Sequence, residues 1–218
     1  MKPILYSYWR SSCSYRVRIA LNFKDIKYEY RPVNLINAEG EQKQTDFTQL
    51  NPKQEVPYFV HDGHSLAQSM AILQYIDDVW PKPELFPKDP KLKSLCLQLS
   101  EIINSGIQPI QNLNVMKTIG KRYAADDKEK ASWSRYWIVE GFKALEQELI
   151  KTSGYFSIKN TVTTADLFLV PQCYNAKRFK IDLENEFPNI FRVYQNCFEL
   201  EEFRRATPEV QPDSPQKK

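Results

Sequence analysis

The hydrophobic pattern of this 218-residue chain changes near residue 81, and no single motif limits the possible folds as strongly. Before this point strand-like and helical runs alternate, whereas after it apolar residues keep almost entirely helical spacing. Prolines interrupt both patterns between the two parts: Pro81, Pro83, Pro87 and Pro90. The sequence therefore predicts two domains, a mixed one with strands and helices over residues 1-82 and an all-helical one over residues 91-207.

The first part predicts the element order β-α-β followed by β-β-α. Residues 4–9 and 27–31 have the composition and alternation of strands. Residues 56–66 predict a β-hairpin, because an Asp-Gly pair lies between two strand-like runs. Ser69 is then expected to cap a helix. The apolar residues of that helix share one face: Ile72, Leu73, Ile76 and Trp80.

The second part predicts a series of helices. One keeps its spacing from Leu92 to Leu113, and Pro109 should kink it because proline removes a backbone hydrogen bond. A second apolar stripe extends from Trp133 to Leu149. Thr163 to Asp166 have the spacing of a capping box at the start of a third helix. After a last helix, the Pro-rich polar end from Thr207 onward is expected to be loosely held.

Hydroxyl groups and a thiol lie where the first strand gives way to the first helix: Ser11, Ser12, Cys13 and Ser14. The first turn of a helix has free N–H groups and partial positive charge, so it stabilises an anion and above all a thiolate. A structural alternative is a serine N-cap beside a buried cysteine, since capping serines are common. These residues alone leave both interpretations open.

Composition and spacing argue against several classes of function. The formal net charge of +3 gives no sign of a nucleic-acid or membrane surface, and no segment is long enough to span a bilayer. His61 and His64 have the spacing of metal ligands, but a turn separates them and no third ligand is evident. The cysteines form no Cys-x-x-Cys pair, which argues against a disulfide framework and indicates a reducing, cytoplasmic compartment. They are Cys13, Cys96, Cys173 and Cys197.

Several stretches together resemble the soluble glutathione transferases, and within them the zeta class. Residues 11–21 carry the signature of that class, with Tyr15 where its members have Trp or His. The segment from Asn51-Pro52 to Val56-Pro57 is similar to the one that ends in a cis-proline across this superfamily. Further similar stretches are the pair 68–69, which resembles a γ-glutamyl-binding pair, and residues 106–112, 163–166 and 176–180.

The resemblance implies the glutathione transferase fold, in which a thioredoxin-like N-terminal domain precedes an all-helical C-terminal domain, and it implies a homodimer. It also implies glutathione as the cofactor. The implied activity is the glutathione-dependent cis–trans isomerisation of maleylacetoacetate to fumarylacetoacetate in phenylalanine and tyrosine degradation. Transfer of glutathione to α-halo acids is the implied side activity.

The resemblance also assigns roles to residues of this chain. It places catalysis on Ser11, Ser12 and Cys13, with Ser11 as the hydroxyl that stabilises the glutathione thiolate. Arg10 and Arg178 are implied to hold the carboxylates of a small dicarboxylic keto acid. The full set implied to bind glutathione is Ser11, Ser12, Cys13, Ser14, Tyr15, Arg16, Gln42, Val56, Pro57, Gln68, Ser69, Gln108, Asn112, Leu113 and Asn114.

Other interpretations of the same residues stay open. Arg16 is equally a candidate for a structural ion pair, and Arg18 is a stronger one. Cys13 could itself form a mixed disulfide with glutathione in a monothiol exchange reaction. A non-catalytic interaction module on the same fold is the third alternative, although such a module would not need the complete set of site residues.

Overall fold

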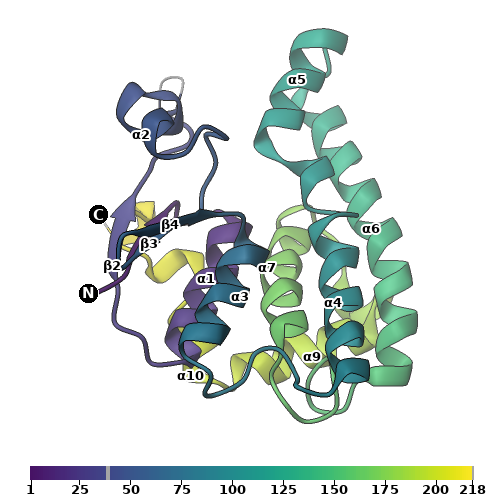
Figure 1. Ribbon diagram of the computed structural model, residues 1–218. Helices are drawn as coiled ribbons and strands as arrows, with labels where there is room; N and C mark the ends of the chain where they lie inside the picture. The colour runs from purple at the N-terminus through teal and green to yellow at the C-terminus, as the bar shows by residue number, and fades with distance from the viewer. Residues whose placement is uncertain (38–39, 218) are drawn as a thin grey trace. The chain divides into compact units, whose positions relative to one another are not determined.

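The computed structural model describes residues 1–37 and 40–217, which form two compact units. The first contains Met1–Leu85 together with the C-terminal segment from Glu199, and the second contains Phe86–Phe198 (Figure 1). The boundary lies within the proline-rich connection that the sequence indicates. The chain is therefore divided once near residue 85 and again near residue 198, where it returns to the first unit.

The described residues of the first unit form one four-stranded sheet. Its strands are β1 (Ile4–Ser7), β2 (Glu29–Pro32), β3 (Tyr58–His61) and β4 (His64–Ala67). The order across the sheet is β2-β1-β3-β4; β1 and β2 are parallel, and β3 is antiparallel to both β1 and β4. This is the predicted β-α-β and β-β-α order, and the predicted hairpin is confirmed as β3–β4.

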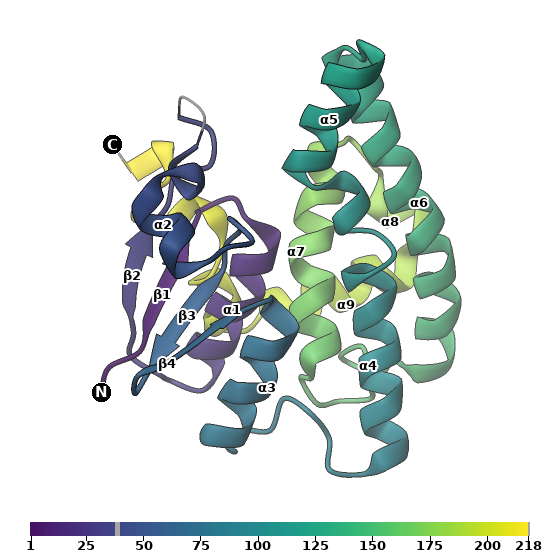
Figure 2. The same ribbon diagram turned by 45° about the horizontal axis from the view of Figure 1, so that its top comes forward.

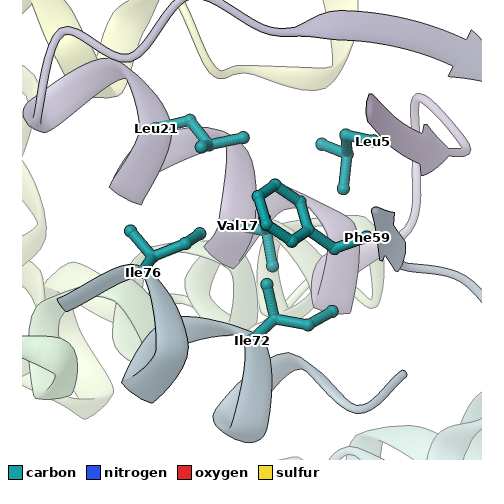
Figure 3. Packing of buried hydrophobic residues seen from close by; sticks show 6 residues of the cluster. All are labelled: Leu5, Val17, Leu21, Phe59, Ile72 and Ile76. Atoms are coloured by element: carbon teal, nitrogen blue, oxygen red, sulfur yellow. The ribbon is translucent and has the colours of Figure 1, made fainter. Parts of the chain in front are cut away.

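Alternation along the strands gives the sheet two different packed faces. Leu5 and Phe59 point to the face covered by α1 (Ser12–Phe23) and α3 (Ser69–Val79) (Figure 3). Tyr58 belongs to a separate cluster with α2 (Thr45–Leu50), which follows the short helix η1 (Glu41–Lys43). Because full burial of one large apolar side chain is worth about 1.5–3 kcal/mol, the first cluster positions α1 and α3 against the sheet, and the second positions α2 through Phe47. The buried residues of the α1–α3 cluster are Leu5, Val17, Leu21, Phe59, Ile72 and Ile76.

The described residues of the second unit are arranged around a buried central helix, α7 (Thr164–Arg178) (Figure 2). Almost every side chain of α7 as far as Ala176 is buried, including the polar side chains of Asp166, Gln172 and Asn175. Helices α4 and α9 pack directly against it. The remaining helices of this unit are α4 (Pro90–Asn104), α5 (Leu113–Tyr123), α6 (Asp127–Thr152), α8 (Leu183–Glu186) and α9 (Pro188–Phe198). None of the helices described is both long and apolar enough to cross a lipid bilayer.

The predicted kink at Pro109 is wrong, because the helix has already ended. α4 stops at Asn104, and Pro109 begins a short 3-10 helix, η2 (Pro109–Gln111), before α5 starts. Proline suits the first position of a helix, where its missing N–H costs nothing. The apolar spacing therefore continued across a break, and Leu113 belongs to a separate helix.

The expectation of a loosely held C-terminal end is also wrong. The end of the chain forms α10 (Glu201–Arg204), η3 (Pro208–Val210) and η4 (Pro215–Lys217), and it packs in the first unit. The side-chain amide of Gln211 donates to the carbonyl oxygens of Arg205 and Thr207 at 3.1 and 2.8 Å, and Ser214 is fully buried. Polar side chains hold this segment in place by hydrogen bonding to backbone groups. Its polar composition was therefore not a sign of disorder, as the prediction assumed. The predicted all-helical range 91-207 accordingly overruns the second unit, which ends at Phe198.

The capping box at the start of α7 is confirmed, and it is buried. Oδ2 of Asp166 accepts from the backbone N–H of Thr163 at 2.8 Å, and Oδ1 accepts from the N–H of Ser157 at 2.8 Å. Burial raises the pKa of Asp166, while these hydrogen bonds oppose the rise. One carboxylate thus connects the start of the central helix to the preceding loop.

Asp166→Ala should lower the free energy of unfolding by about 3 kcal/mol or more, because two buried N–H groups lose their acceptor. The control is Asp126→Ala, which removes the N-cap carboxylate from the exposed capping box at the start of α6 and should cost about 1 kcal/mol. Urea denaturation of both variants measures the difference. Equal losses for the two aspartates would contradict the assignment of Asp166 as a buried structural anchor.

Candidate functional site at the N-terminus of α1

Ser11 is the N-cap of α1. Its Oγ accepts a hydrogen bond from the backbone N–H of Ser14 at 3.2 Å, so the structural alternative for this serine is realised. A hydroxyl has one donor and two acceptor lone pairs, and capping uses only a lone pair. The O–H of Ser11 is therefore still able to donate to an anion, and capping does not exclude a role in stabilising a thiolate.

Ser12 and Cys13 occupy the first turn of α1 and are half-buried. Their N–H groups belong to the part of a helix that has no intrahelical acceptors, where the helix dipole favours negative charge. Cys13 is a free thiol. The turn thus combines a hydroxyl, a thiol and backbone donors within three successive residues.

The next three residues of the predicted set point into the protein. The side chains of Ser14, Tyr15 and Arg16 are each at most 1 % exposed. The Tyr15 ring lies 5.2 Å from the guanidinium carbon of Arg18. Arg16 donates from Nη1 to Oγ of Ser69 at 2.9 Å, which connects α1 to the start of α3. This geometry favours a supporting role for Arg16 over direct contact with a ligand.

The start of α3 differs by one residue from the sequence prediction. Gln68, not Ser69, is the N-cap, and Ser69 is the first helical residue, with its hydroxyl accepting from Arg16. Gln68 has φ of 70°, a left-handed conformation that is uncommon for a residue with a side chain. Its side chain is exposed while Ser69 is buried. An exposed amide therefore lies directly before a second helix N-terminus.

The segment before β3 contains the predicted cis peptide bond, between Val56 and Pro57. Among the described residues, neither the backbone N–H nor the carbonyl of Val56 has a hydrogen-bond partner. Gln42, in η1, is only 4 % exposed, and its Oε1 likewise has no partner within the described part of the chain. Both residues thus keep polar groups that an extended peptide ligand could satisfy.

The remaining predicted residues lie in the second unit. Gln108 precedes η2, and Asn112 caps α5 by accepting from the N–H of Asn114 at 3.0 Å. Leu113 is the first residue of α5. Gln111 was not among the residues predicted to bind a ligand. Its side-chain amide donates to buried Gln172 of α7 at 2.7 Å and so holds the segment between α4 and α5 against α7.

The two arginines implied to bind substrate are both on the surface of their own units. Arg10 is half-buried, with its guanidinium 5.5 Å from the centre of the Trp9 ring. Arg178 is the last residue of α7 and is exposed, with Nη1 3.5 Å from Oδ1 of Asn175. Arg178 therefore lies where a helix C-terminus favours a cation.

The histidine pair forms part of the sheet. His61 and His64 are paired across the β3–β4 hairpin, and Nδ1 of His61 lies 2.9 Å from the hydroxyl of Tyr75. No group of three metal-binding side chains occurs among the described residues. The pair thus contributes to a cluster of aromatic rings with Tyr75 and Trp80.

Comparison with known proteins decides the family. Residues 1–78 match the family model for the glutathione S-transferase N-terminal domain. Maleylacetoacetate isomerase of Dictyostelium discoideum is 45 % identical over 98 % of this chain and 96 % of its own length. The chain belongs to the zeta class of glutathione transferases. The strand order of its first unit is accordingly that of a thioredoxin-like domain, and its second unit is the helical domain of this fold.

Solved structures of the class agree closely with this one. A bacterial maleylpyruvate isomerase of the zeta class, in its holo form, superimposes with a TM-score of 0.93 at 39 % identity, covering 97 % of this chain and 99 % of the other. Maleylacetoacetate isomerase of Anaeromyxobacter dehalogenans with glutathione in its active site gives 0.87 at 40 % identity, covering 98 % of each chain. The same isomerase has also been solved with dicarboxyethyl glutathione and citrate in the active site, with a TM-score of 0.86 at 38 % identity over 98 % and 94 % of the two chains.

Proposed function

We propose that this protein is a glutathione-dependent maleylacetoacetate isomerase. The observation that carries this conclusion is the Ser11-Ser12-Cys13 turn at the first turn of α1, in a chain that is 45 % identical to such an isomerase over nearly its full length. A helix N-terminus with a hydroxyl donor favours a thiolate. A thiolate that adds reversibly to a conjugated cis double bond allows that bond to isomerise.

The residues of the first unit fit glutathione. Val56 has free backbone groups of the kind that pair with an extended peptide, and Gln68 lies at a second helix N-terminus that favours a carboxylate. When bound, glutathione supplies a thiolate that adds reversibly to the double bond, so that rotation becomes possible and the cofactor is recovered. Ser11 donates its O–H to that sulfur, and the free N–H groups of Ser12 and Cys13 add to the local positive potential.

The substrate is a dianion, and its carboxylates need cations. Arg10 and Arg178 are the proposed partners, because neither is buried and a guanidinium pairs with a carboxylate through two parallel hydrogen bonds. Arg16 acts in this proposal through Ser69, whose orientation it fixes. A homodimer, a cytoplasmic location and a side activity on α-halo acids complete the proposal.

A second candidate is thiol exchange by Cys13. The observation in its favour is that this free thiol is half-buried within the first helical turn, where a thiolate is stabilised. In that reaction the Cys13 thiolate attacks the glutathione sulfur of a disulfide between glutathione and another thiol, forms a Cys13–glutathione disulfide and releases the other thiol as its thiolate. A second glutathione thiolate then resolves the mixed disulfide.

Glutathione should be required for isomerisation and should not be consumed. The isomerisation of maleylacetone is assayed under three conditions: with glutathione, without any thiol, and with S-methylglutathione. S-methylglutathione has the same peptide groups as glutathione but no thiol. We expect turnover only with glutathione and an unchanged concentration of free glutathione at the end. Turnover without a thiol, or loss of one glutathione per product, would refute the proposal.

Two substitutions separate the capping role of Ser11 from its role as a donor. Ser11→Ala removes cap and hydroxyl and should cost about 1 kcal/mol of stability, whereas Ser11→Gly should cost only a few tenths because glycine is an acceptable N-cap. Both should raise the pKa of the bound glutathione thiol alike, since each removes one charged hydrogen bond worth about 1.5–3 kcal/mol. Ultraviolet titration of the bound thiolate measures this.

Cys13→Ala distinguishes the two candidate functions in the same assays. We expect it to retain most of the isomerase activity, because the thiolate belongs to glutathione. If Cys13→Ala instead abolishes turnover, and a Cys13–glutathione disulfide is trapped in the unmodified protein, thiol exchange is the function.

Arg178→Ala should raise the Michaelis constant for a diacid substrate and leave that for an uncharged electrophile unchanged. The loss is that of one charged hydrogen-bonding partner, at most about 3 kcal/mol. Lys180→Ala, which removes a neighbouring exposed cation, is the control and should affect neither constant. Equal effects on the two substrates would assign Arg178 to the helix C-terminus alone.

A further inference from the structure

The turn that leads from β1 into α1 is held through both backbone polar groups of one residue, Trp9. Within this turn the N–H of Ser11 donates to the carbonyl of Tyr8 at 2.9 Å. The backbone N–H of Trp9 donates to Oδ2 of Asp213 at 2.9 Å, and the carbonyl of Trp9 accepts from Nη2 of Arg18 at 3.0 Å. A carboxylate and a guanidinium thus fix the residue that lies two positions before the N-cap.

Arg18 is completely buried, and its donors are satisfied by backbone and hydroxyl oxygens. Nη1 donates to Oγ of Ser7 at 3.2 Å and to the carbonyl of Tyr8 at 3.4 Å, and Nε donates to the carbonyl of Ala206 at 3.1 Å. Burial lowers the pKa of Arg18, yet an arginine stays protonated in proteins. Its position is therefore determined by the surrounding backbone, including that of the C-terminal segment.

Asp213 is fixed equally well. Its Oδ1 accepts from the hydroxyl of Tyr30, on β2, at 2.6 Å. Burial raises the pKa of that phenol, so Tyr30 remains a donor. The residue next to Asp213, Ser214, is fully buried. A carboxylate held in this way fixes the direction of the Trp9 N–H, which a freely rotating surface aspartate would not do.

We infer that Asp213 is a positioning residue for the isomerisation: it fixes the Tyr8–Ser11 turn and thereby the direction of the Ser11 O–H and of the first-turn N–H groups of α1. This inference rests on the proposed function. Hydrogen bonds to a thiolate are directional, and small displacements of a reacting group reduce turnover strongly. The C-terminal segment would thus act on the reaction without touching the reacting atoms.

The test compares Asp213→Ala with Tyr30→Phe. Asp213→Ala removes the acceptor of the Trp9 N–H, whereas Tyr30→Phe removes only the other partner of the same carboxylate. We expect Asp213→Ala to raise the pKa of the bound glutathione thiol by about one unit, and to lower kcat about tenfold, with its pH profile moved to higher pH. Tyr30→Phe should change the thiol pKa and kcat less than Asp213→Ala does, because it loosens the carboxylate but leaves the acceptor of the Trp9 N–H in place. Asp213→Asn, which retains an acceptor oxygen, should give intermediate values.

A purely structural role for Asp213 predicts a lower melting temperature but an unchanged thiol pKa, pH profile and kcat at temperatures where the variant is folded. That result would overturn the inference, as would equal shifts in the Asp213→Ala and Tyr30→Phe enzymes. If Asp213→Ala does not fold, the same comparison is made with Asp213→Asn, and an unchanged thiol pKa there overturns the inference. The unmodified enzyme is assayed first, because failure of its isomerase activity would refute the proposed function and not this inference.

Discussion

The buried guanidinium of Arg18 connects the parts of the first unit on which the site depends. It lies on α1, donates to the backbone at the end of β1, and reaches the carbonyl of Ala206 in the C-terminal segment. A buried charge of this kind is stable only when its donors are satisfied, so the surrounding carbonyl groups and the arginine determine one another's positions. Strand, helix and C-terminal segment therefore form one cooperative arrangement, and the Ser11 turn is part of it.

The second unit depends on a different constraint, the burial of α7. A helix that is buried along most of its length has no solvent to satisfy its free N-terminal groups, so its cap must come from within the protein. Thr163 and Asp166 together provide that cap, and Asp166 also binds the loop before it through the N–H of Ser157. Both units thus use a buried charged side chain to join an element to a distant or preceding segment, and in both the charge is satisfied largely by backbone groups.

The proposed chemistry of the site relies on helix ends more than on titratable side chains. The start of α1 contributes backbone donors and the Ser11 hydroxyl, while the start of α3 carries Ser69, which Arg16 holds from α1. The two helices pack on the same face of the sheet. The apolar cluster that includes Leu5, Val17 and Ile72 therefore also fixes the position of the start of α1 relative to the start of α3 (Figure 3). Hydrophobic packing thereby supports the proposed binding of an anionic peptide.

The sequence by itself determined the features that depend on near neighbours along the chain. The Asp-Gly hairpin, the Thr163–Asp166 box and the serine cap each need only a few adjacent residues, and alternation of apolar residues sufficed for the element order of the first unit. Resemblance to the zeta class predicted the cis bond before Pro57, which the structure contains. Two local signals failed. Ser69 is the first residue of α3 and not its N-cap, and apolar spacing continued through the break between α4 and α5, because periodicity does not record where backbone hydrogen bonds end.

Only the tertiary structure decided the placement of the C-terminal end and the partners of the buried arginines. Asp213 is 204 positions from Trp9, and nothing in the local composition around it distinguishes an anchored carboxylate from a solvated one. Arg18 was expected to form an ion pair, but its hydrogen bonds go to carbonyl and hydroxyl oxygens. Such contacts depend on how segments distant in sequence pack together. Every residue has a backbone carbonyl that can accept a hydrogen bond, so the residue type does not show which carbonyl a buried arginine will bind.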